Sequence, residues 1–120
     1  MESEWIARGA LLVTMVGAGV LLIWMANAAA SGRLKRNHLA GIRVPSTMAS
    51  EEAWLAAHVR ARTATIYAGV ISIFGGAIAL VPVPMPVVTI GILVAAVITL
   101  GFVLYGARVG SAAAKATSQS

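Results

Sequence analysis

The sequence contains no cysteine and few charged residues, which make up 11% of its 120 positions. Without cysteine, the protein has neither disulfides nor thiolate metal ligands. Soluble domains carry about 25% charged residues, and a small domain leaves a large fraction of its surface in water. Because 59% of this chain is hydrophobic, a water-soluble fold would expose far too much apolar surface. The composition therefore predicts a membrane protein.

Acidic residues are scarcer than basic ones, with four Asp or Glu against nine Lys or Arg, so the net charge is +5. A positive balance of this kind can indicate nucleic-acid binding. Here the basic residues stand between apolar stretches, where the topology of a membrane protein accounts for them. We therefore expect the lipid bilayer as the main partner and no specific nucleic acid.

Three apolar stretches are long enough to cross a bilayer, which takes about 20 helical residues. They run from about 5 to 30, from 63 to 81 and from 87 to 109, and none contains an acidic residue. Backbone polar groups in the bilayer core must be bonded within the protein, and no stretch alternates as a strand does. The predicted fold class is all-α, a single polytopic membrane domain with three transmembrane helices and a short cytoplasmic helix.

The charges and prolines predict how these spans are connected. Three prolines between residues 82 and 86 cannot continue a helix, so the second and third spans should be antiparallel neighbours joined by a short outer turn. Eight of the nine basic residues lie in the segment 31–62 or at the C-terminal end of the third span and beyond. Positive charge favours the cytoplasmic side. We expect 31–62 and the tail 110–120 in the cytoplasm and the N-terminus outside.

The N-terminal stretch also resembles a signal peptide, because a basic residue and an apolar run precede the small residues at 26–28. The apolar run is longer than a usual signal core, and the start of the chain is acidic. We therefore expect this stretch to be retained as the first span.

Small residues recur at four-residue spacing in each span. Lipid tails give helices no hydrophobic reason to associate, so residues that allow close approach matter most. The three series are Ala10, Thr14 and Ala18; Ala68, Ser72 and Gly76; and Gly91, Ala95 and Thr99. We expect at least two of them to form helix contacts, within one chain or between chains. A homo-oligomer or a larger complex would suit a protein with only three spans.

The span interiors contain no ionisable residue, whereas transporters and proton relays place such groups at membrane depth. Arg8 should extend to the outer interface, and Asn27 should bond a neighbouring backbone group. Trp5, Trp24 and Tyr105 lie near span ends, which is typical of interfacial anchors. Small multidrug exporters have a similar length, but they have four spans and a membrane-embedded glutamate. We therefore rank a transporter or channel below other functions.

Two histidines and an acidic pair lie outside the spans, at His38, His58, Glu51 and Glu52. Their spacing matches no standard zinc motif. The hydroxyl residues nearby have no histidine at a spacing that suggests a catalytic triad. We therefore predict no metal ligand, no cofactor and no catalytic residue.

The most specific stretch of the chain is RNHLAGIRVPSTMASEEAW, residues 36–54. Glycine and Val44–Pro45 indicate a turn. Ser50 followed by an acidic pair is typical of a helix N-terminus, and Trp54 and His58 then share a face. The helix should lie along the membrane surface or run straight into the second span. A basic connector with an ordinary capped helix would explain part of this pattern.

This stretch resembles the signature of the SdpI family of bacterial membrane proteins. The residues that carry the resemblance are Arg36, Asn37, His38, Gly41, Ile42, Arg43, Pro45, Ser46, Thr47, Glu51, Glu52, Ala53, Trp54 and His58. Family members usually read Gly-Ile-Arg-Thr-Pro, and this chain has Val44 at the Thr position. The chain is similar to the C-terminal three-span unit of longer members.

The resemblance implies a multi-pass protein of the bacterial inner membrane without enzymatic activity. It further implies protection against a membrane-active toxin peptide, or cytoplasmic capture of a repressor. Within the signature we expect Arg43 and Glu52 to form a charge pair that docks the loop onto its helix, and Trp54 to anchor it at the interface. An accessory subunit of a larger membrane complex is the alternative function.

Overall fold

The structure is a computed structural model that describes residues 2–119. Its elements are α1 (Glu2–Ala30), α2 (Pro45–Met48), α3 (Glu51–Ala77), the 3-10 turn η1 (Ile78–Leu80) and α4 (Met85–Gln119). Three of them, α1, α3 continued by η1, and α4, are long and apolar enough to cross a membrane. No strand occurs between residues 2 and 119, and the all-α prediction is confirmed.

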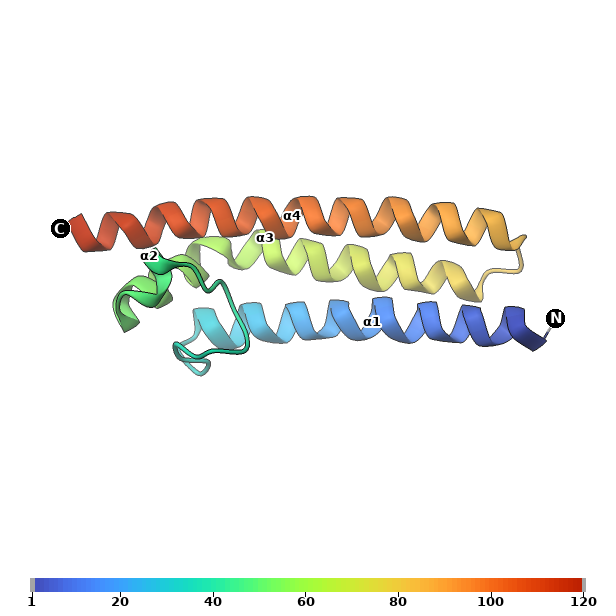
Figure 1. The fold of residues 1–120 in the computed structure, drawn as a ribbon, viewed down its shortest axis with the longest axis horizontal. Helices are drawn as coiled ribbons and strands as arrows, with labels where there is room; N and C mark the ends of the chain where they lie inside the picture. The colour runs from blue at the N-terminus through green and yellow to red at the C-terminus, as the bar shows by residue number, and fades with distance from the viewer. Residues whose placement is uncertain (1, 120) are drawn as a thin grey trace.

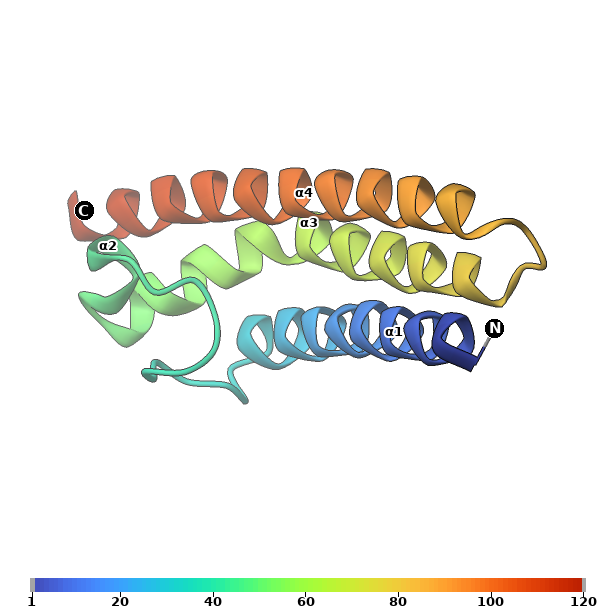
Figure 2. The ribbon, with the colours of Figure 1, turned by 45° about the vertical axis from the view of Figure 1, so that its right-hand side comes forward.

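The three long helices form an elongated bundle of 59 × 21 × 19 Å. Helix α3 runs antiparallel to both α1 and α4 and lies between them (Figures 1 and 2). It packs along both neighbours, whereas the backbones of α1 and α4 do not approach each other closely. Side chains of α1, among them Leu11 and Met15, still pack against the buried cluster that includes Val88 and Ile92 of α4. One end of the bundle carries the turn between α3 and α4, and the opposite end carries the loop 31–50 (Figure 1).

Helix α3 starts at a capped N-terminus and continues without a break into the apolar stretch. The Ser50 hydroxyl accepts a hydrogen bond of 3.0 Å from the Ala53 amide, and Glu51 and Glu52 occupy the first turn, where carboxylates suit the helix dipole. The segment 51–62 holds all four charged side chains of α3. The stretch of α3 without charged side chains therefore begins after Arg62, and the short helix expected before it is the start of the same helix.

The proline turn at the other end of α3 separates η1 from α4. Helix α3 tightens into η1, and α4 begins at Met85, with the Pro84 carbonyl accepting the amides of Val87 and Val88. Proline suits a first helical turn because its missing amide has no partner there. Helix α4 then continues to Gln119. The segment 110–119, expected as a tail, is helical because its alanine-rich sequence favours the helix.

Close backbone contacts fix α3 against both neighbours. A Cβ atom added to Gly69 would lie 2.7 Å from the Gly19 carbonyl oxygen of α1, so the two backbones touch at this crossing. One Cβ on Gly76 would lie 2.9 Å from the Met15 Cβ, and one on Gly75 would collide with Ala95 of α4. Of the two adjacent glycines, Gly76 therefore contacts α1 and Gly75 contacts α4, on different sides of α3.

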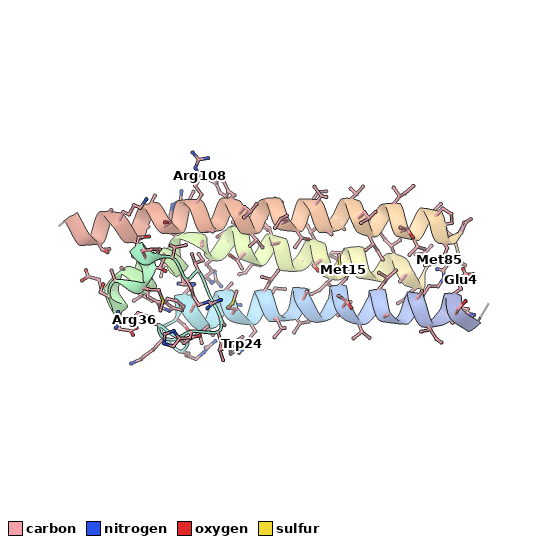
Figure 3. All side chains as sticks on the ribbon, viewed as in Figure 1. Glu4, Met15, Trp24, Arg36, Met85 and Arg108 are labelled. Carbon is pink, nitrogen blue, oxygen red and sulfur yellow. The ribbon has the colours of Figure 1, made fainter. Side chains whose placement is uncertain are left out.

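The predicted small-residue series of α3 and α4 lie at these contacts within one chain. Ala68, Ser72 and Gly76 are buried, and the Ser72 hydroxyl donates a 2.7 Å hydrogen bond to the Met15 carbonyl. Met15 extends from α1 toward α3 (Figure 3). Ala95 packs against Gly75, and Gly91 contacts Ile78.

The series expected on α1 makes no such contact. Ala10, Thr14 and Ala18 are exposed, and α1 packs instead through Met15, Gly19 and Ile23. The physical reason is that α3 already supplies glycines at the crossing. The larger side chains of α1 fill the space that Gly69 and Gly76 leave, so at this crossing α1 needs a small residue only at Gly19.

Arg8 does not extend to the interface as expected but is only 8% exposed. Its guanidinium donates to the carbonyls of Ala79 (3.1 Å) and Val81 (3.0 Å), to the Val83 carbonyl, and to the Glu4 carboxylate at 3.2 Å. These carbonyls lie where η1 ends and the proline turn begins, so helical amides no longer reach them. Arg8 thus ties α1 to the turn.

Substituting Gly76→Leu should lower the thermal stability of the purified protein in detergent. The added side chain meets Met15 and Val16 of α1, and overpacking of this kind costs about 1–3 kcal/mol. Circular dichroism during heating measures the change. Gly101→Leu is the matched control, because a Cβ at Gly101 has no neighbour within 4 Å; equal melting temperatures for the two variants would contradict the contact.

Substituting Arg8→Gln should also destabilise the protein, because it removes the donors for three carbonyls of the turn. Hydrogen bonds to charged groups contribute about 1.5–3 kcal/mol each, so a loss of about 2 kcal/mol or more is expected. Glu4→Gln is the control, since it breaks only a half-exposed ion pair. If Glu4→Gln were equally harmful in thermal melts, the ion pair would be the important contact.

Candidate functional site: the loop between the first and third helices

The loop 31–50 folds back against the start of α3 instead of running freely between the spans (Figures 1 and 3). Helix α1 ends in a tight turn in which the Leu34 amide donates to the Ala28 carbonyl at 2.8 Å, and Gly32 has a positive φ of 86°. The Leu34 carbonyl then accepts a 2.9 Å hydrogen bond from the Trp54 indole. The first contact between loop and α3 therefore uses the tryptophan of the signature.

Trp54 and His58 form a ring pair on one face of α3, with centroids 4.2 Å apart. Trp54 is 1% exposed, so it is not the interfacial anchor expected from the sequence. It is buried because the loop covers this face. Gly41 lies directly on the pair, and a Cβ there would be 2.5 Å from Trp54 Cη2 and 2.8 Å from His58 Nε2. Its φ of 106° also favours glycine.

His58 holds the loop by accepting a hydrogen bond from a backbone amide. The Ile42 amide donates to His58 Nε2 at 2.9 Å, and Nδ1 lies 2.7 Å from the Trp54 carbonyl oxygen. Because a carbonyl only accepts, Nδ1 carries the hydrogen and Nε2 is unprotonated. Burial lowers the pKa of His58, and the bond to the Trp54 carbonyl opposes this in part. The neutral ring is therefore the form that fits the loop.

The rest of the loop is held by its own polar side chains. Asn37 Oδ1 accepts the amides of Leu39 and Ala40, both at 2.8 Å, which makes a local turn. Thr47 is fully buried, and its hydroxyl donates to the Ile42 carbonyl at 2.6 Å. Pro45 stands at the first position of α2, where proline is favoured.

The charge pair expected between Arg43 and Glu52 is not formed. Arg43 donates to the His38 carbonyl, and the ion pair that joins the loop to α3 is between Arg36 Nε and Glu51, at 3.4 Å. Arg36 also donates to the Met48 carbonyl at 2.8 Å. Successive helix residues point about 100° apart, so only one carboxylate of the acidic pair faces the start of the loop.

The loop also reaches α4, which the sequence interpretation did not anticipate. The hydroxyls of Ser46 and Ser111 are 3.0 Å apart. A Cβ added to Gly110 would lie 2.8 Å from the Ala57 carbonyl oxygen and 3.1 Å from Ile42 Cδ1. Gly106, Gly110 and Ala114 are all buried at four-residue spacing, a pattern from which this contact could have been predicted. The last turns of α4 are thus part of the site.

The arrangement is a structural unit without an obvious reactive group. His58, the buried titratable side chain of α3 that contacts the loop, uses both ring nitrogens for the fold. No group of three His, Cys, Asp or Glu residues that could hold a metal ion is found in the part of the chain that the structure describes. What the unit presents outward is its loop surface, on which His38, Leu39 and Arg43 are exposed.

Residues 33–106 match the model of the SdpI/YfhL protein family, which is more than half of the chain. The chain belongs to this family. The resemblance inferred from the signature is confirmed, and the matched region includes the loop, all of α3 and most of α4. No curated protein and no solved structure matches the chain significantly.

In this SdpI/YfhL family member, most of the signature residues are engaged in holding the loop. Trp54 and His58 form its buried centre, Gly41 covers them, and Arg36 and Asn37 shape its start. His38, Arg43 and Glu52 are exposed. The signature therefore encodes a particular loop conformation.

The thermal stability of the protein should fall as the pH falls below about 6.5. The pKa of His58 is lowered from its ordinary value of 6.5 in the folded protein, so the unfolded chain binds the proton more tightly. Stability is fully present above the unfolded pKa and is lost as the pH falls through the folded pKa. A proton on Nε2 would also face the Ile42 amide, which is a donor as well.

Melting temperatures measured in detergent from pH 8 to pH 5 check this expectation. His58→Gln keeps an acceptor near Nε2 but does not titrate, so its melting temperature should change less over this range. His38→Gln is the control, because His38 is exposed and its replacement should leave the pH dependence as in the wild type. An unchanged pH dependence in His58→Gln would exclude this role for His58.

Proposed function

We propose that this protein is a non-enzymatic, SdpI-type membrane protein of the immunity or signalling type. It would lie in a bacterial inner membrane, with the loop 31–50 and the end of α4 in the cytoplasm and the proline turn outside. The charge distribution supports this orientation, because Arg8 is the only basic residue at the turn end and it forms an ion pair with Glu4.

The observation that carries the proposal is the ordered loop. A connector that only sets membrane topology needs a few Lys or Arg residues. It does not need a buried Trp54–His58 pair covered by a glycine with positive φ. The loop instead presents a defined surface, on which Leu39 is 90% exposed. A protein partner would meet the apolar Leu39 together with the exposed His38 and Arg43 on this surface.

The opposite end offers a surface for an extracellular peptide. A hollow of about 240 Å³ lies between the start of α1 and the turn, with Trp5, Arg8 and Leu80 among its lining residues. Trp5 and Leu80 are strongly exposed. The exposed Trp5 and Leu80 suit the apolar face of a membrane-active peptide, whereas the Arg8 guanidinium beside them is already bound to Glu4 and to the carbonyls of the turn. A toxin would meet the protein here.

Helix α3 connects the two ends without interruption. It runs from the cap at Ser50 to η1, where Arg8 binds the Ala79 carbonyl, and its first turns support the loop. A shift of the turn on toxin binding would therefore act on the same rigid element that carries the loop. This provides a physical route for a signal, since rigid packed elements transmit displacement.

A strain that lacks this protein should be more sensitive to secreted membrane-active peptides than its parent. Growth inhibition across a panel of such peptides measures the effect, and expression of the wild-type chain should restore resistance. Gly41→Val should restore it poorly, because the loop cannot close over Trp54. Gly101→Val is the control, because a Cβ at Gly101 meets no neighbouring atom.

Immunoblots of isolated membranes should show both variants at wild-type levels, so that lost resistance reflects the loop. Equal sensitivity of the deletion strain and its parent to every peptide would refute the immunity role. If Gly41→Val protected as well as Gly101→Val, immunity would not depend on the loop.

An accessory subunit of a larger membrane complex is the second candidate. The exposed small residues of α1 favour it, because Ala10, Thr14 and Ala18 line a face on which another helix can approach closely. A second copy of this chain would use the same face. Purification from native membranes in mild detergent distinguishes the candidates: a stoichiometric partner supports a subunit, and a solitary oligomer supports the first function.

A further inference from the structure

A basic hollow lies at the loop end of the bundle, between the last turn of α1 and the polar start of α3. Its volume is about 540 Å³, and it is lined by Asn27, Ala30, Ser31, Arg33, Val59 and Arg62. Two of these side chains are cationic and none is acidic. The hollow is separate from the Trp54–His58 centre of the loop, and the proposed immunity function does not use it.

Asn27 positions one of the two arginines. Asn27 Nδ2 donates to the Ile23 carbonyl at 3.1 Å, so its Oδ1 is directed to accept from Arg62 Nε, at 2.9 Å. This bond uses one of the five N–H donors of the guanidinium. The four donors on the terminal nitrogens stay available, and their planar fork matches two oxygens of a phosphate group.

Arg33 supplies the second cation from the other side of the hollow. It follows the glycine turn that ends α1. It forms no hydrogen bond or ion pair with any of the residues 2–119, which the structure describes. Its side chain is exposed. An arginine that the fold does not use, placed beside one that the fold orients, is suited to a ligand with two or more anionic oxygens.

The depth of the hollow in the membrane identifies the kind of ligand. The apolar part of α3 begins directly after Arg62. Trp24 lies one turn before Asn27 on α1 and is 52% exposed, which is typical of a ring at the bilayer interface. At a rise of about 1.5 Å per residue, Asn27 is only about 4.5 Å farther along the axis. The hollow therefore lies at the level of the lipid headgroups.

We propose that this hollow binds the headgroup phosphate of an anionic phospholipid from the surrounding leaflet. Arg62 and Arg33 bind the phosphate oxygens, and Asn27 holds Arg62 in place. Val59 and Ala30 form the apolar wall beside the glycerol and the first acyl carbons, which a free phosphate ion would not need. Basic pockets between transmembrane helices recognise lipids in this way. The bound lipid joins α1 to α3 at the end where the loop begins.

Native mass spectrometry of the full chain in detergent, titrated with phosphatidylglycerol, tests this site. Phosphatidylcholine, whose headgroup has no net charge, should bind much more weakly. Replacing both arginines, Arg33→Gln with Arg62→Gln, should weaken phosphatidylglycerol binding by about tenfold or more. Arg33→Gln alone should weaken it too, and it disturbs no contact of the fold.

Two further variants separate a built site from general surface charge. Arg108 lies on the face of α4 that points away from α1 and α3 (Figure 3). Arg108→Gln removes one charge from this face and should leave binding unchanged. Asn27→Ala keeps every charge but releases Arg62, and it should weaken binding. Melting temperatures near that of the wild type show that these variants are folded.

Three results would overturn the assignment. Equal losses for Arg108→Gln and Arg33→Gln would show that the attraction is only diffuse charge. Equal binding of phosphatidylcholine would show that no anionic lipid is preferred. Displacement of phosphatidylglycerol by millimolar inorganic phosphate would assign the hollow to a soluble anion instead of a lipid.

Discussion

The close contact of α3 with both neighbouring helices is the constraint on which the rest of the structure depends. A bilayer gives apolar helices no hydrophobic reason to associate, so close packing must hold them together. Gly69 meets Gly19 of α1, and Gly75 meets Ala95 of α4. Because the backbones of α1 and α4 stay apart, the contacts with α3 largely set how the two outer helices lie. They thereby place the two ends of the bundle relative to each other.

Both ends solve the same problem, which is how to bond backbone groups that leave a helix near a membrane. Unpaired carbonyls and amides are costly there. At the turn, Arg8 of α1 donates to carbonyls that follow α3. At the loop, His58 accepts the Ile42 amide and Trp54 donates to the Leu34 carbonyl. In each case a buried side chain from a long helix holds irregular backbone, and α3 takes part in both.

The sequence was sufficient to predict features that belong to one helix at a time. The apolar stretches gave the three long helices, Ser50 gave the start of α3, and spacing gave the shared face of Trp54 and His58. Contacts between elements were harder. The charges alone could not show that Arg36 pairs with Glu51. The sequence does not show which way a charged side chain points, and several pairings between the loop and the acidic pair are compatible with it.

Arg8 and the first span were misjudged for a related reason. An arginine one or two turns inside a span is ordinarily expected to reach water, and only the unbonded carbonyls of the proline turn make burial favourable here. The small residues of α1 fit a packing motif by spacing, but the glycines of α3 had already provided the close approach. Which of two complementary helices carries the small residues is a property of the pair, and one helix alone does not reveal it.

The structure also changes how the family signature is understood. Trp54 and His58 are enclosed by the fold beneath Gly41 and have little surface to offer a partner. Such residues specify the shape of the loop, whereas binding depends on what the loop displays, such as the exposed Leu39. A shared scaffold does not imply a shared ligand. In this chain the signature residues therefore act mainly on the conformation of the loop, and the side chains that the loop exposes are the ones that a partner would meet.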